Sequence, residues 1–283
     1  MAAVPDPPFA SAIWVDGSLV APRAAVVSAF DHGLTVGDGV FETLRVVRGA
    51  PFALRRHLDR LACSAAGLGL GLPDRSVLER AAAEVVADAG LADARLRLTV
   101  TAGPAPLGSG RGTAEPTLIV AVAPPQPFPA VVEVAVVPWP RNERSAVVGV
   151  KTTSYAENVV ALAHARRLGA GEAIFANTRG ELCEGTGSNV VVAVGGRLVT
   201  PPLSSGCLAG VTRSLVLELV DVAEGDLPVS ALAEADEAFL TSTTRECQPI
   251  AAVDGRLLAS APGPLTKAAM VAFADLVARD LDP

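Results

Sequence analysis

Lys151 is the residue whose type and position most clearly predict chemistry in this sequence. The chain has only two lysines, Lys151 and Lys267, among 23 basic residues, and Lys151 follows an apolar run that predicts a buried strand over residues 147–151. A helix is predicted next, over residues 155–168. Burying an unpaired ammonium is costly, so such a lysine tends to lose its proton, and the neutral amine can form a Schiff base with a carbonyl. The alternative is a lysine at a strand end that points into solvent.

A second segment could place a carboxylate beside this amine. Residues 172–177 predict a strand, residues 178–180 predict a turn, and the chain then returns through Glu184 to Asn189. We expect this hairpin to bring Glu184 back toward Lys151. A carboxylate that faces a pyridinium nitrogen is the partner that an electron-sink cofactor requires.

Two further features could bind a phosphate group. Arg60 belongs to a predicted helix over residues 54–66, and a guanidinium binds phosphate through two parallel hydrogen bonds. A helix is also predicted at residues 214–220, where backbone amides and the hydroxyl of Thr212 form an anion site at the helix start. Each feature has an ordinary alternative. Arg60 would be a solvated charge on an amphipathic helix, and the later helix would be capped without a ligand.

The remaining pattern predicts strands and helices on both sides of one linker. Residues 94–101 alternate as a half-buried strand should, and this register puts Arg95, Arg97 and Thr99 on one face. The proline-rich residues 124–129 predict a boundary between two domains. Further strands are predicted at residues 40–47, 116–123, 131–137, 190–194, 197–200 and 237–240, and further helices at residues 74–89 and 265–277.

Composition argues against several classes of function. A net charge of −7 without basic clusters argues against nucleic acid as a partner. No uncharged apolar run reaches the length of about 18 residues that a membrane span needs, and residues 1–8 lack the features of a secretory signal. The four cysteines show no Cys-x-x-Cys spacing and are expected to be reduced thiols, and with three histidines no metal site is expected. We therefore expect a soluble cytoplasmic protein.

Several motifs together resemble one family. The sequence Lys-Thr-Thr-Ser-Tyr-Ala-Glu-Asn-Val begins at Lys151, and Cys-Glu-Gly-Thr-Gly-Ser-Asn-Val begins at Cys183. Gly-Asp-Gly-Val-Phe-Glu stands at residues 37–42, His-x-x-Arg-Leu at 57–61 and Gly-Val-Thr-Arg at 210–213. With these motifs the chain is similar, over nearly its whole length, to class IV aminotransferases. These are fold type IV pyridoxal-phosphate enzymes, which include branched-chain and D-amino-acid aminotransferases and aminodeoxychorismate lyases.

The resemblance implies a fold, a cofactor and a partner. It implies a two-domain α+β (mixed α/β) chain with a smaller N-terminal α/β domain at residues 1–123, a linker at 124–130 and a larger, β-barrel-like domain with helices at 131–283. It implies pyridoxal 5'-phosphate as the cofactor and small-molecule amino acids and 2-oxo acids as substrates. Members of the family are commonly homodimers, so a homodimer is expected here.

The resemblance also implies roles for individual positions. Lys151 would hold the cofactor as a Schiff base and move the proton during the reaction, and Glu184 would keep the pyridine nitrogen protonated. Tyr155, the only tyrosine, would hydrogen-bond the phenolic oxygen of the cofactor. The phosphate would be anchored by Arg60, Val211, Thr212, Ser242 and Thr243, and the substrate would be bound by Arg97, Gly39 and Phe41.

Transamination between an amino acid (or amine) and a 2-oxo acid is the predicted reaction. The alternative is an aminodeoxychorismate lyase that forms 4-aminobenzoate and pyruvate. The glycine-rich residues 108–112 resemble loops of those lyases, whereas the context of Glu42 and the presence of Arg97 favour transamination. Ala102 stands where the D-amino-acid enzymes place an arginine, which weighs against D specificity. A non-catalytic pyridoxal-phosphate carrier is a third hypothesis, disfavoured by the intact set of lysine, acid and arginine.

Overall fold

The structure is a computed structural model that describes residues 10–283. The prediction about residues 1–8 therefore lies outside the described residues. The chain divides into two compact units. The first contains the described residues up to Gln126 together with Val150–Ser154 and Asp280–Pro283, and the second contains Pro127–Gly149 and Tyr155–Arg279. Lys151 therefore belongs to the first unit, although most of the sequence around it belongs to the second.

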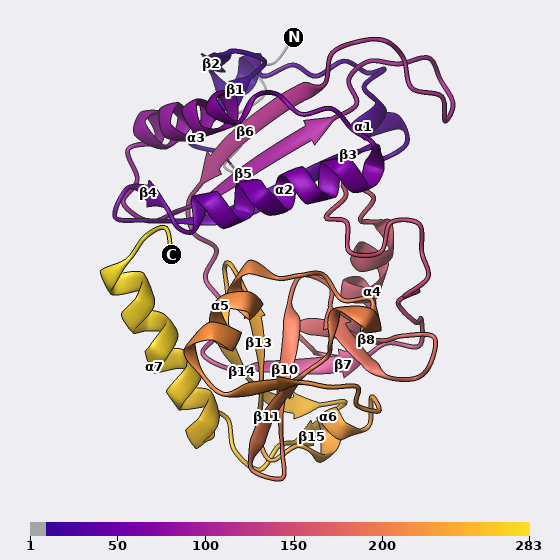
Figure 1. Cartoon of the computed structure of the whole chain (residues 1–283), viewed down its shortest axis with the longest axis vertical. Coiled ribbons are helices and arrows are strands. Elements are labelled where there is room, and N and C mark those ends of the chain that lie inside the picture. Colours follow the sequence, from indigo (N-terminus) through magenta and orange to yellow (C-terminus); the bar gives the residue numbers. More distant parts are fainter. Residues whose placement is uncertain (1–9) are drawn as a thin grey trace. The chain divides into compact units, whose positions relative to one another are not determined.

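An antiparallel sheet forms the centre of the first unit (Figure 1). Its apolar and polar residues alternate, because successive side chains of a strand point to opposite faces. The predicted strand at residues 94–101 is confirmed, and Arg95, Arg97 and Thr99 lie on its less buried face. In the described part of this unit six strands pair in the order β2-β1-β6-β5-β3-β4, with bounds β1 Ala12–Val15, β2 Ser18–Val20, β3 Gly39–Val47, β4 Ala50–Pro51, β5 Ala94–Thr101 and β6 Thr117–Ala123.

Two long helices pack on this sheet. Helix α2 (Leu54–Leu68) lies against β3, and helix α3 (Arg75–Ala89) lies against β1 and β6. The apolar positions of α2 recur every three or four residues, which gives one face to the sheet. Gly69 ends α2 in a left-handed conformation (φ 60°), which only glycine adopts without a steric cost. A one-turn helix α1 (His32–Thr35) and a 3-10 turn (Pro22–Ala24) complete the helical elements described here.

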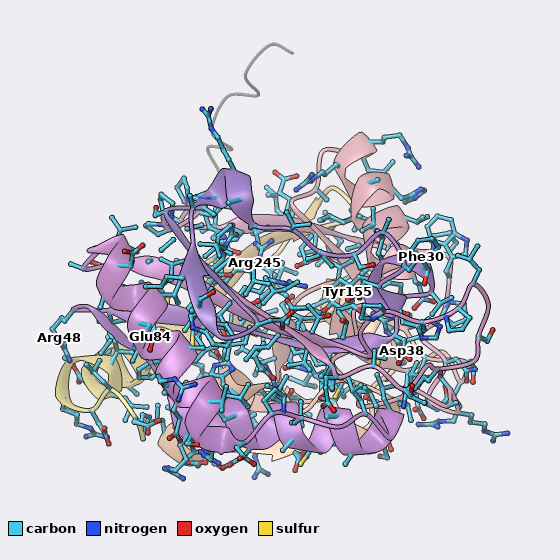
Figure 2. The ribbon with its side chains drawn as sticks, turned by 90° about the horizontal axis from the view of Figure 1, so that it is seen from above. Phe30, Asp38, Arg48, Glu84, Tyr155 and Arg245 are labelled. Carbon is cyan, nitrogen blue, oxygen red and sulfur yellow. The ribbon has the colours of Figure 1, made fainter. Side chains whose placement is uncertain are left out.

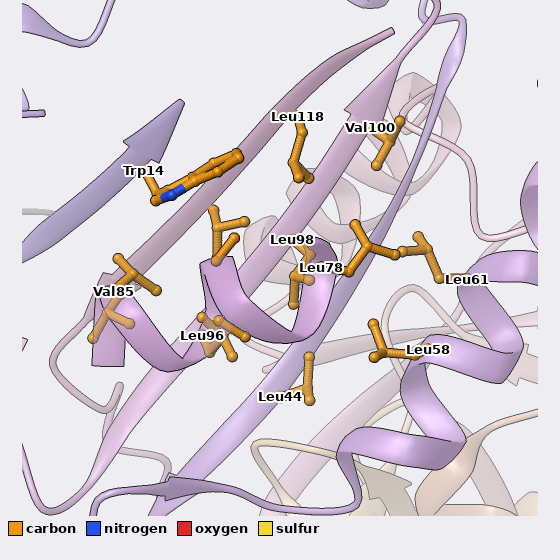
Figure 3. Close-up of a cluster of buried hydrophobic side chains, with 14 of the residues drawn as sticks. Trp14, Leu44, Leu58, Leu61, Leu78, Val85, Leu96, Leu98, Val100 and Leu118 are labelled. Carbon is orange, nitrogen blue, oxygen red and sulfur yellow. The ribbon is translucent and has the colours of Figure 1, made fainter. Parts of the chain in front are cut away.

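The core of the first unit lies between the sheet and these helices (Figure 3). Fully burying a large apolar side chain contributes about 1.5–3 kcal/mol to folding. Trp14 also needs a polar partner, and its indole Nε1 donates to Glu84 Oε2 at 3.0 Å. Glu84 projects from α3 (Figure 2), so this bond ties the helix to β1. The largest fully buried side chains of this core are Trp14, Leu44, Leu61, Leu96 and Leu98.

A curled mixed sheet forms the second unit, all of whose residues are described. Strand β7 pairs in parallel with both β8 and β14. Strands β7 and β8 bury apolar side chains on both faces, with Val134 and Ile174 in one cluster and Ala135 and Phe175 in another. Nine strands take part, in the order β12-β11-β10-β13-β14-β7-β8-β9 with β15 on β14: β7 Val132–Val136, β8 Glu172–Ala176, β9 Leu182–Gly185, β10 Asn189–Val194, β11 Arg197–Thr200, β12 Val222–Glu224, β13 Ala238–Ser242, β14 Glu246–Val253 and β15 Arg256–Leu257.

Helices cover this second sheet. Helix α4 (Ala156–Arg167) packs its alanines against Phe175 of β8, and α7 (Pro264–Arg279) packs on β14 and on α5 (Val211–Leu219) (Figure 1). The short α6 (Ala231–Glu234) and a 3-10 turn (Leu203–Ser205) complete the helices of the second unit. Both units therefore mix helices with a sheet, which confirms the predicted α+β fold class.

The strand predicted before Lys151 is wrong. Residues 146–149 form turns, and Gly149 takes a left-handed conformation (φ 73°). Val147 and Val148 stay 40% and 39% exposed, and their amides bond to Ser145 instead of to a neighbouring strand. The valine run favours a strand locally, but β-propensity decides only where a partner strand and a covered face are available. The predicted helix over residues 155–168 is confirmed as α4, whereas α5 begins at Val211, three residues before the predicted start.

Candidate active site

The backbone of Lys151 is held by two elements of the first unit. Its carbonyl accepts a hydrogen bond from the amide of Phe41 at 3.0 Å, and its amide donates to Ser64 Oγ of α2 at 3.1 Å. The next residue, Thr152, forms an isolated bridge with Val40 of β3. Lys151 is half-buried, and its Nζ lies 4.4 Å from the centroid of the Phe41 ring. The chain thus fixes this amine against an aromatic face without a regular strand.

The glycines before β3 allow the lysine segment to approach closely. Thr153 donates from its amide to the carbonyl of Gly39 at 2.8 Å and from Oγ1 to the carbonyl of Gly37 at 2.9 Å. A Cβ atom on Gly39 would lie 2.8 Å from the carbonyl oxygen of Val100 and 3.1 Å from Thr153 Oγ1. Gly39 is therefore required for backbone packing around Lys151, and its predicted contact with substrate remains a prediction.

Phe41 also contacts a second cation. The guanidinium carbon of Arg97 lies 3.7 Å from the centroid of the Phe41 ring, and Arg97 Nε donates to Thr99 Oγ1 at 3.2 Å. Arg97 is exposed, whereas Phe41 is buried. The first unit therefore places two predicted site residues, Lys151 and Arg97, against the ring of a third, Phe41.

Arg60 forms a two-pronged ion pair with Glu42. Arg60 Nε donates to Glu42 Oε1 and Arg60 Nη2 donates to Glu42 Oε2, each at 2.7 Å. The second oxygen also accepts from His57 Nδ1 at 2.7 Å. Burial alone would raise the pKa of Glu42, but the charge and hydrogen bonds of Arg60, together with His57, hold this pKa at about 2. Glu42 is therefore ionised at neutral pH, and it shares the face of β3 with Val40 and Leu44.

A second charged cluster lies where the glycine-rich loop meets β3. Arg111 donates from Nε and Nη2 to the two oxygens of Asp38 at 2.6 Å, and it also donates to the carbonyls of Leu68 and Gly69 at the end of α2. His32 Nδ1 lies 2.9 Å from Asp38 Oδ2, and its Nε2 lies 2.9 Å from the carbonyl oxygen of Gly108. The loop is therefore tied to Asp38, which is labelled in Figure 2.

Glu184 lies on β9 of the second unit, where it contacts Leu208 and Arg141. Its Oε2 accepts from the amide of Leu208 at 2.9 Å, and its Oε1 lies 3.3 Å from Arg141 Nε. The Arg141 guanidinium stacks on the ring of Phe175, 4.2 Å from the centroid, and Phe175 pairs with Glu184 across the strands. A fixed carboxylate with a cation beside it suits the role of a partner for a protonated ring nitrogen.

Arg141 also connects Glu184 to the start of α4. The same guanidinium contacts Glu157 and donates to Asn158 Oδ1 at 3.1 Å. Tyr155 occupies the position directly before α4, where its carbonyl accepts from the amide of Val159 at 3.0 Å. Glu184 and Tyr155 are therefore both attached to the elements around Arg141.

The start of α5 has the chemistry of an anion site. Val211 and Thr212 are its first residues and are buried, and within the described chain no side chain caps this nine-residue helix. The first amides of a helix have no partner inside the helix, and its N-terminus carries partial positive charge. A Cβ atom on Gly210 would lie 2.0 Å from Asn189 Oδ1, so this turn is closely packed. These donors fit a phosphate ester.

The end of β13 supplies hydroxyl groups in the same unit. Ser242 Oγ accepts from the amide of Arg245 at 3.2 Å, and Thr243 follows in the turn. Within the described residues Thr241 Oγ1 is buried without a hydrogen-bond partner. A buried hydroxyl without a partner is uncommon, and a bound polar group would satisfy it.

Three residues at these sites were given no role by the sequence patterns. Glu42 and Asp38 belong to the quoted motifs, but their partners Arg60 and Arg111 lie on other elements. A charged residue at a core-facing position of an apolar strand was the available signal for Glu42. Arg141 stands in a loop without a pattern, and no sequence signal identifies it.

Within residues 10–283 no group of three or more His, Cys, Asp or Glu side chains could hold a metal ion. In the same range no helix has the length and apolar character to cross a membrane.

The chain is similar over most of its length to known aminotransferases and to a related lyase. The chain is 34% identical over 277 residues to a putative branched-chain-amino-acid aminotransferase of Methanocaldococcus jannaschii, covering 93% of this chain and 96% of that one. It is 32% identical to a D-alanine aminotransferase of Bacillus licheniformis, with 90% and 93% covered. It is 30% identical to an aminodeoxychorismate lyase of Bacillus subtilis, with 92% and 93% covered.

Solved structures and a family model also show similarity to aminotransferases. The Escherichia coli branched-chain amino acid aminotransferase superposes with a TM-score of 0.89 at 28% identity, with 94% of each chain covered. A hypothetical aminotransferase from Mycobacterium tuberculosis in a PLP-bound form superposes with a TM-score of 0.80 at 29% identity, with 93% and 99% covered. The family model described as amino-transferase class IV matches residues 39–253. The chain belongs to the class IV aminotransferase family.

Proposed function

We propose that this aminotransferase uses pyridoxal 5'-phosphate to move an amino group between an amino acid, or an amine, and a 2-oxo acid, with Lys151 as its catalytic residue. The observation that carries the proposal is the fixed position of Lys151, whose backbone is bound to Phe41 and Ser64. Support for the cofactor comes from the Mycobacterium tuberculosis relative in its PLP-bound form. The donor sets described above fit such a group.

Lys151 supplies the proton chemistry. When bound, pyridoxal phosphate withdraws electrons from the substrate α-carbon and so makes its proton removable. The Lys151 Nζ removes this proton from the amino donor and returns a proton to the α-carbon of the oxo acid in the second half of the cycle. The Phe41 ring, 4.4 Å from Nζ, keeps one side of this amine away from water.

Other residues bind and orient. In the second unit Glu184, held by Arg141 and the amide of Leu208, keeps the ring nitrogen protonated, and Tyr155 donates to the phenolic oxygen. In the first unit Arg97 binds the substrate carboxylate, since a guanidinium pairs with a carboxylate through two hydrogen bonds. We assign the phosphate group to Arg60, Val211, Thr212, Ser242 and Thr243, and the substrate side to Arg97, Gly39 and Phe41.

The proposal extends to assembly and compartment. We propose a homodimer, as the family resemblance implies, and a cytoplasmic location. The four cysteines (Cys63, Cys183, Cys207 and Cys247) are free thiols, which suits a reducing compartment. Light scattering of the purified protein tests the dimer.

A side-by-side assay tests the reaction. The purified protein is given branched-chain L-amino acids, D-alanine, an (R)-amine and aminodeoxychorismate, each with and without a 2-oxo acid. We expect amino transfer that depends on the 2-oxo acid and is lost in Lys151→Ala, while Lys267→Ala keeps it. Pyruvate and 4-aminobenzoate formed together without an amino acceptor would identify a lyase and overturn the proposal.

A further inference from the structure

Glu42 is a buried carboxylate whose two oxygens both accept hydrogen bonds from neighbouring side chains. Its side chain is 0% exposed, and three donor atoms of Arg60 and His57 bind its two oxygens at 2.7 Å each. An ionised carboxylate inside a protein is costly unless such bonds offset its lost hydration. A residue this costly on an otherwise apolar strand face needs an explanation beyond packing.

We propose that Glu42 and His57 are positioning residues that hold the Arg60 guanidinium in the orientation required to bind the phosphate of the cofactor. This inference rests on the proposed function, which assigns Arg60 to that phosphate. Glu42 acts through the Nε–Nη2 edge of Arg60, and His57 acts one step further away, through Glu42.

The geometry of the pair explains why orientation is the effect. Two parallel hydrogen bonds fix both the position and the plane of a guanidinium, which a single contact does not. The long side chain of Arg60 would otherwise lose its conformational entropy when the phosphate binds. Because Glu42 already orders this side chain, the entropic cost of phosphate binding is lower. Glu42 itself is ordered by β3, where Phe41 and Thr43 on either side pair with β5.

His57 keeps the carboxylate from turning. It is buried on α2, one helical turn before Arg60, and its Nδ1 faces Glu42 Oε2. An ionised carboxylate has no proton to donate, so Nδ1 carries the hydrogen in this bond. Burial lowers the pKa of His57, which keeps the ring neutral, and the hydrogen bond to Glu42 opposes that shift. His57 thus adds a fixed hydrogen bond without a second full positive charge.

Electrostatics makes the opposite prediction, which makes the proposal testable. The negative charge of Glu42 repels a phosphate, so neutralising it would strengthen phosphate binding if charge alone mattered. If orientation matters more, Glu42→Gln weakens phosphate binding, because the new amide group places a donor against the guanidinium donors. The sign of the change separates these two effects.

The experiment compares two ligands that differ by the phosphate. Apoprotein of each variant is titrated with pyridoxal 5'-phosphate and with pyridoxal, and the ratio of the two dissociation constants gives the preference for phosphate. Arg60→Gln and Glu42→Gln are each expected to lower this preference about tenfold, the effect of one lost charge-assisted hydrogen bond, with the affinity for pyridoxal unchanged. The control is Glu79→Gln, which removes an exposed glutamate that pairs with Arg75 on α3.

His57 variants give a second, independent readout. His57→Leu removes the donor and is expected to lower the phosphate preference severalfold, whereas His57→Asn keeps an N–H near the position of Nδ1 and restores most of it. Thermal unfolding of each apoprotein shows whether a variant folds. If Glu42→Gln does not fold, the His57 variants still test the inference.

The outcomes separate the inference from the function on which it rests. An unchanged preference in Arg60→Gln would remove the phosphate role of Arg60 and the inference with it. Suppose that Arg60→Gln lowers the preference for phosphate. The inference alone would then be overturned if Glu42→Gln left this preference unchanged or raised it. It would also be overturned if His57→Leu and His57→Asn had the same preference for phosphate. Equal losses for pyridoxal and its phosphate in Glu42→Gln would also overturn it, since they would indicate general damage to the fold.

Discussion

The side-chain nitrogen of Lys151 lies 4.4 Å from the centre of the Phe41 ring, and the amide of Phe41 donates to the carbonyl of Lys151 at 3.0 Å. One residue of β3 therefore fixes both the backbone and the amine of Lys151. Replacing Phe41 by Leu removes the aromatic face but keeps an apolar side chain. We expect this variant to fold and to lose activity about tenfold, mainly in kcat, because the amine is less well placed. Steady-state kinetics measure this, and an unchanged kcat would contradict it.

Gly39→Ala should disturb the lysine segment. The added Cβ would lie 2.8 Å from the carbonyl oxygen of Val100, which is closer than a real Cβ contact, so the backbone must shift. Overpacking of this kind costs about 1–3 kcal/mol of stability. Gly110→Ala is the matched control, since nothing lies within 4 Å of a Cβ there. Denaturant unfolding compares the two, and equal stability would show that the segment can adapt.

The Glu42 cluster should make the protein acid-labile. The pKa of Glu42 is about 2 in the folded protein, below its ordinary value of 4.5. The stabilising contribution of Glu42 is therefore present above about pH 4.5 and is lost as the pH falls toward 2. The pKa of His57 is lowered from its ordinary value of 6.5, so His57 also reduces the stability of the folded protein as the pH falls below 6.5. Unfolding free energies measured from pH 7 downward should fall steeply, and less steeply in Glu42→Gln. Equal slopes would exclude Glu42 as the source.

The His32 cluster should respond to alkali. The hydrogen bonds of His32 to Asp38 and to the Gly108 carbonyl raise its pKa. Its contribution is therefore fully present below the ordinary value of 6.5 and is lost as the pH rises through the raised folded pKa. The groups that face it are Asp38 and, beyond that carboxylate, Arg111, whose hydrogen bonds also hold the pKa of Asp38 below its ordinary value.

Hydrogen exchange at residues 104–112 measures this effect. The loop should lose protection as the pH rises, after correction for the intrinsic exchange rate, because both ring nitrogens of His32 face acceptor oxygens and a neutral ring can satisfy only one. His32→Asn should remove the pH dependence, whereas His164→Asn, at a half-buried position on α4, should keep it. Protection that is independent of pH in the unmodified protein would contradict the assignment.

Arg141→Gln should weaken the site around Glu184. Arg141 Nε lies 3.3 Å from Glu184 Oε1, and the same guanidinium contacts the start of α4. Removing it leaves a largely buried carboxylate without its cation, which costs about 1–3 kcal/mol. We expect kcat to fall about tenfold in Arg141→Gln and less in Arg141→Lys, which keeps the charge. Unchanged kinetics in both variants would show that the amide of Leu208 is enough to hold Glu184.

Much of the fold could be predicted from the sequence because most elements have strong local patterns. The strand at residues 94–101 alternates, and the helix beginning at Leu54 has an apolar face. This helix and the helix beginning at Ala156 both end at or near glycine. The strand predicted at residues 147–151 is wrong because a strand exists only with a partner, and local propensity does not identify one.

The charge pairs were harder to predict. Glu42 and Arg60 are separated by 18 positions and lie on a strand and a helix, so their contact depends on how α2 packs on β3. Asp38 and Arg111 are separated by 73 positions and meet only because a loop folds back over the start of β3. Lys151, by contrast, could be selected from sequence since the chain has a single other lysine, Lys267.

Chemical trapping of the cofactor tests the central claim most directly. The protein is loaded with pyridoxal 5'-phosphate, reduced with borohydride and digested with trypsin, and the peptides are identified by mass spectrometry. A modified Lys151 resists cleavage, so we predict one phosphopyridoxyl label, in a peptide that spans residues 145–166. A label on Lys267, or no label on an enzyme that still transfers amino groups, would contradict the account.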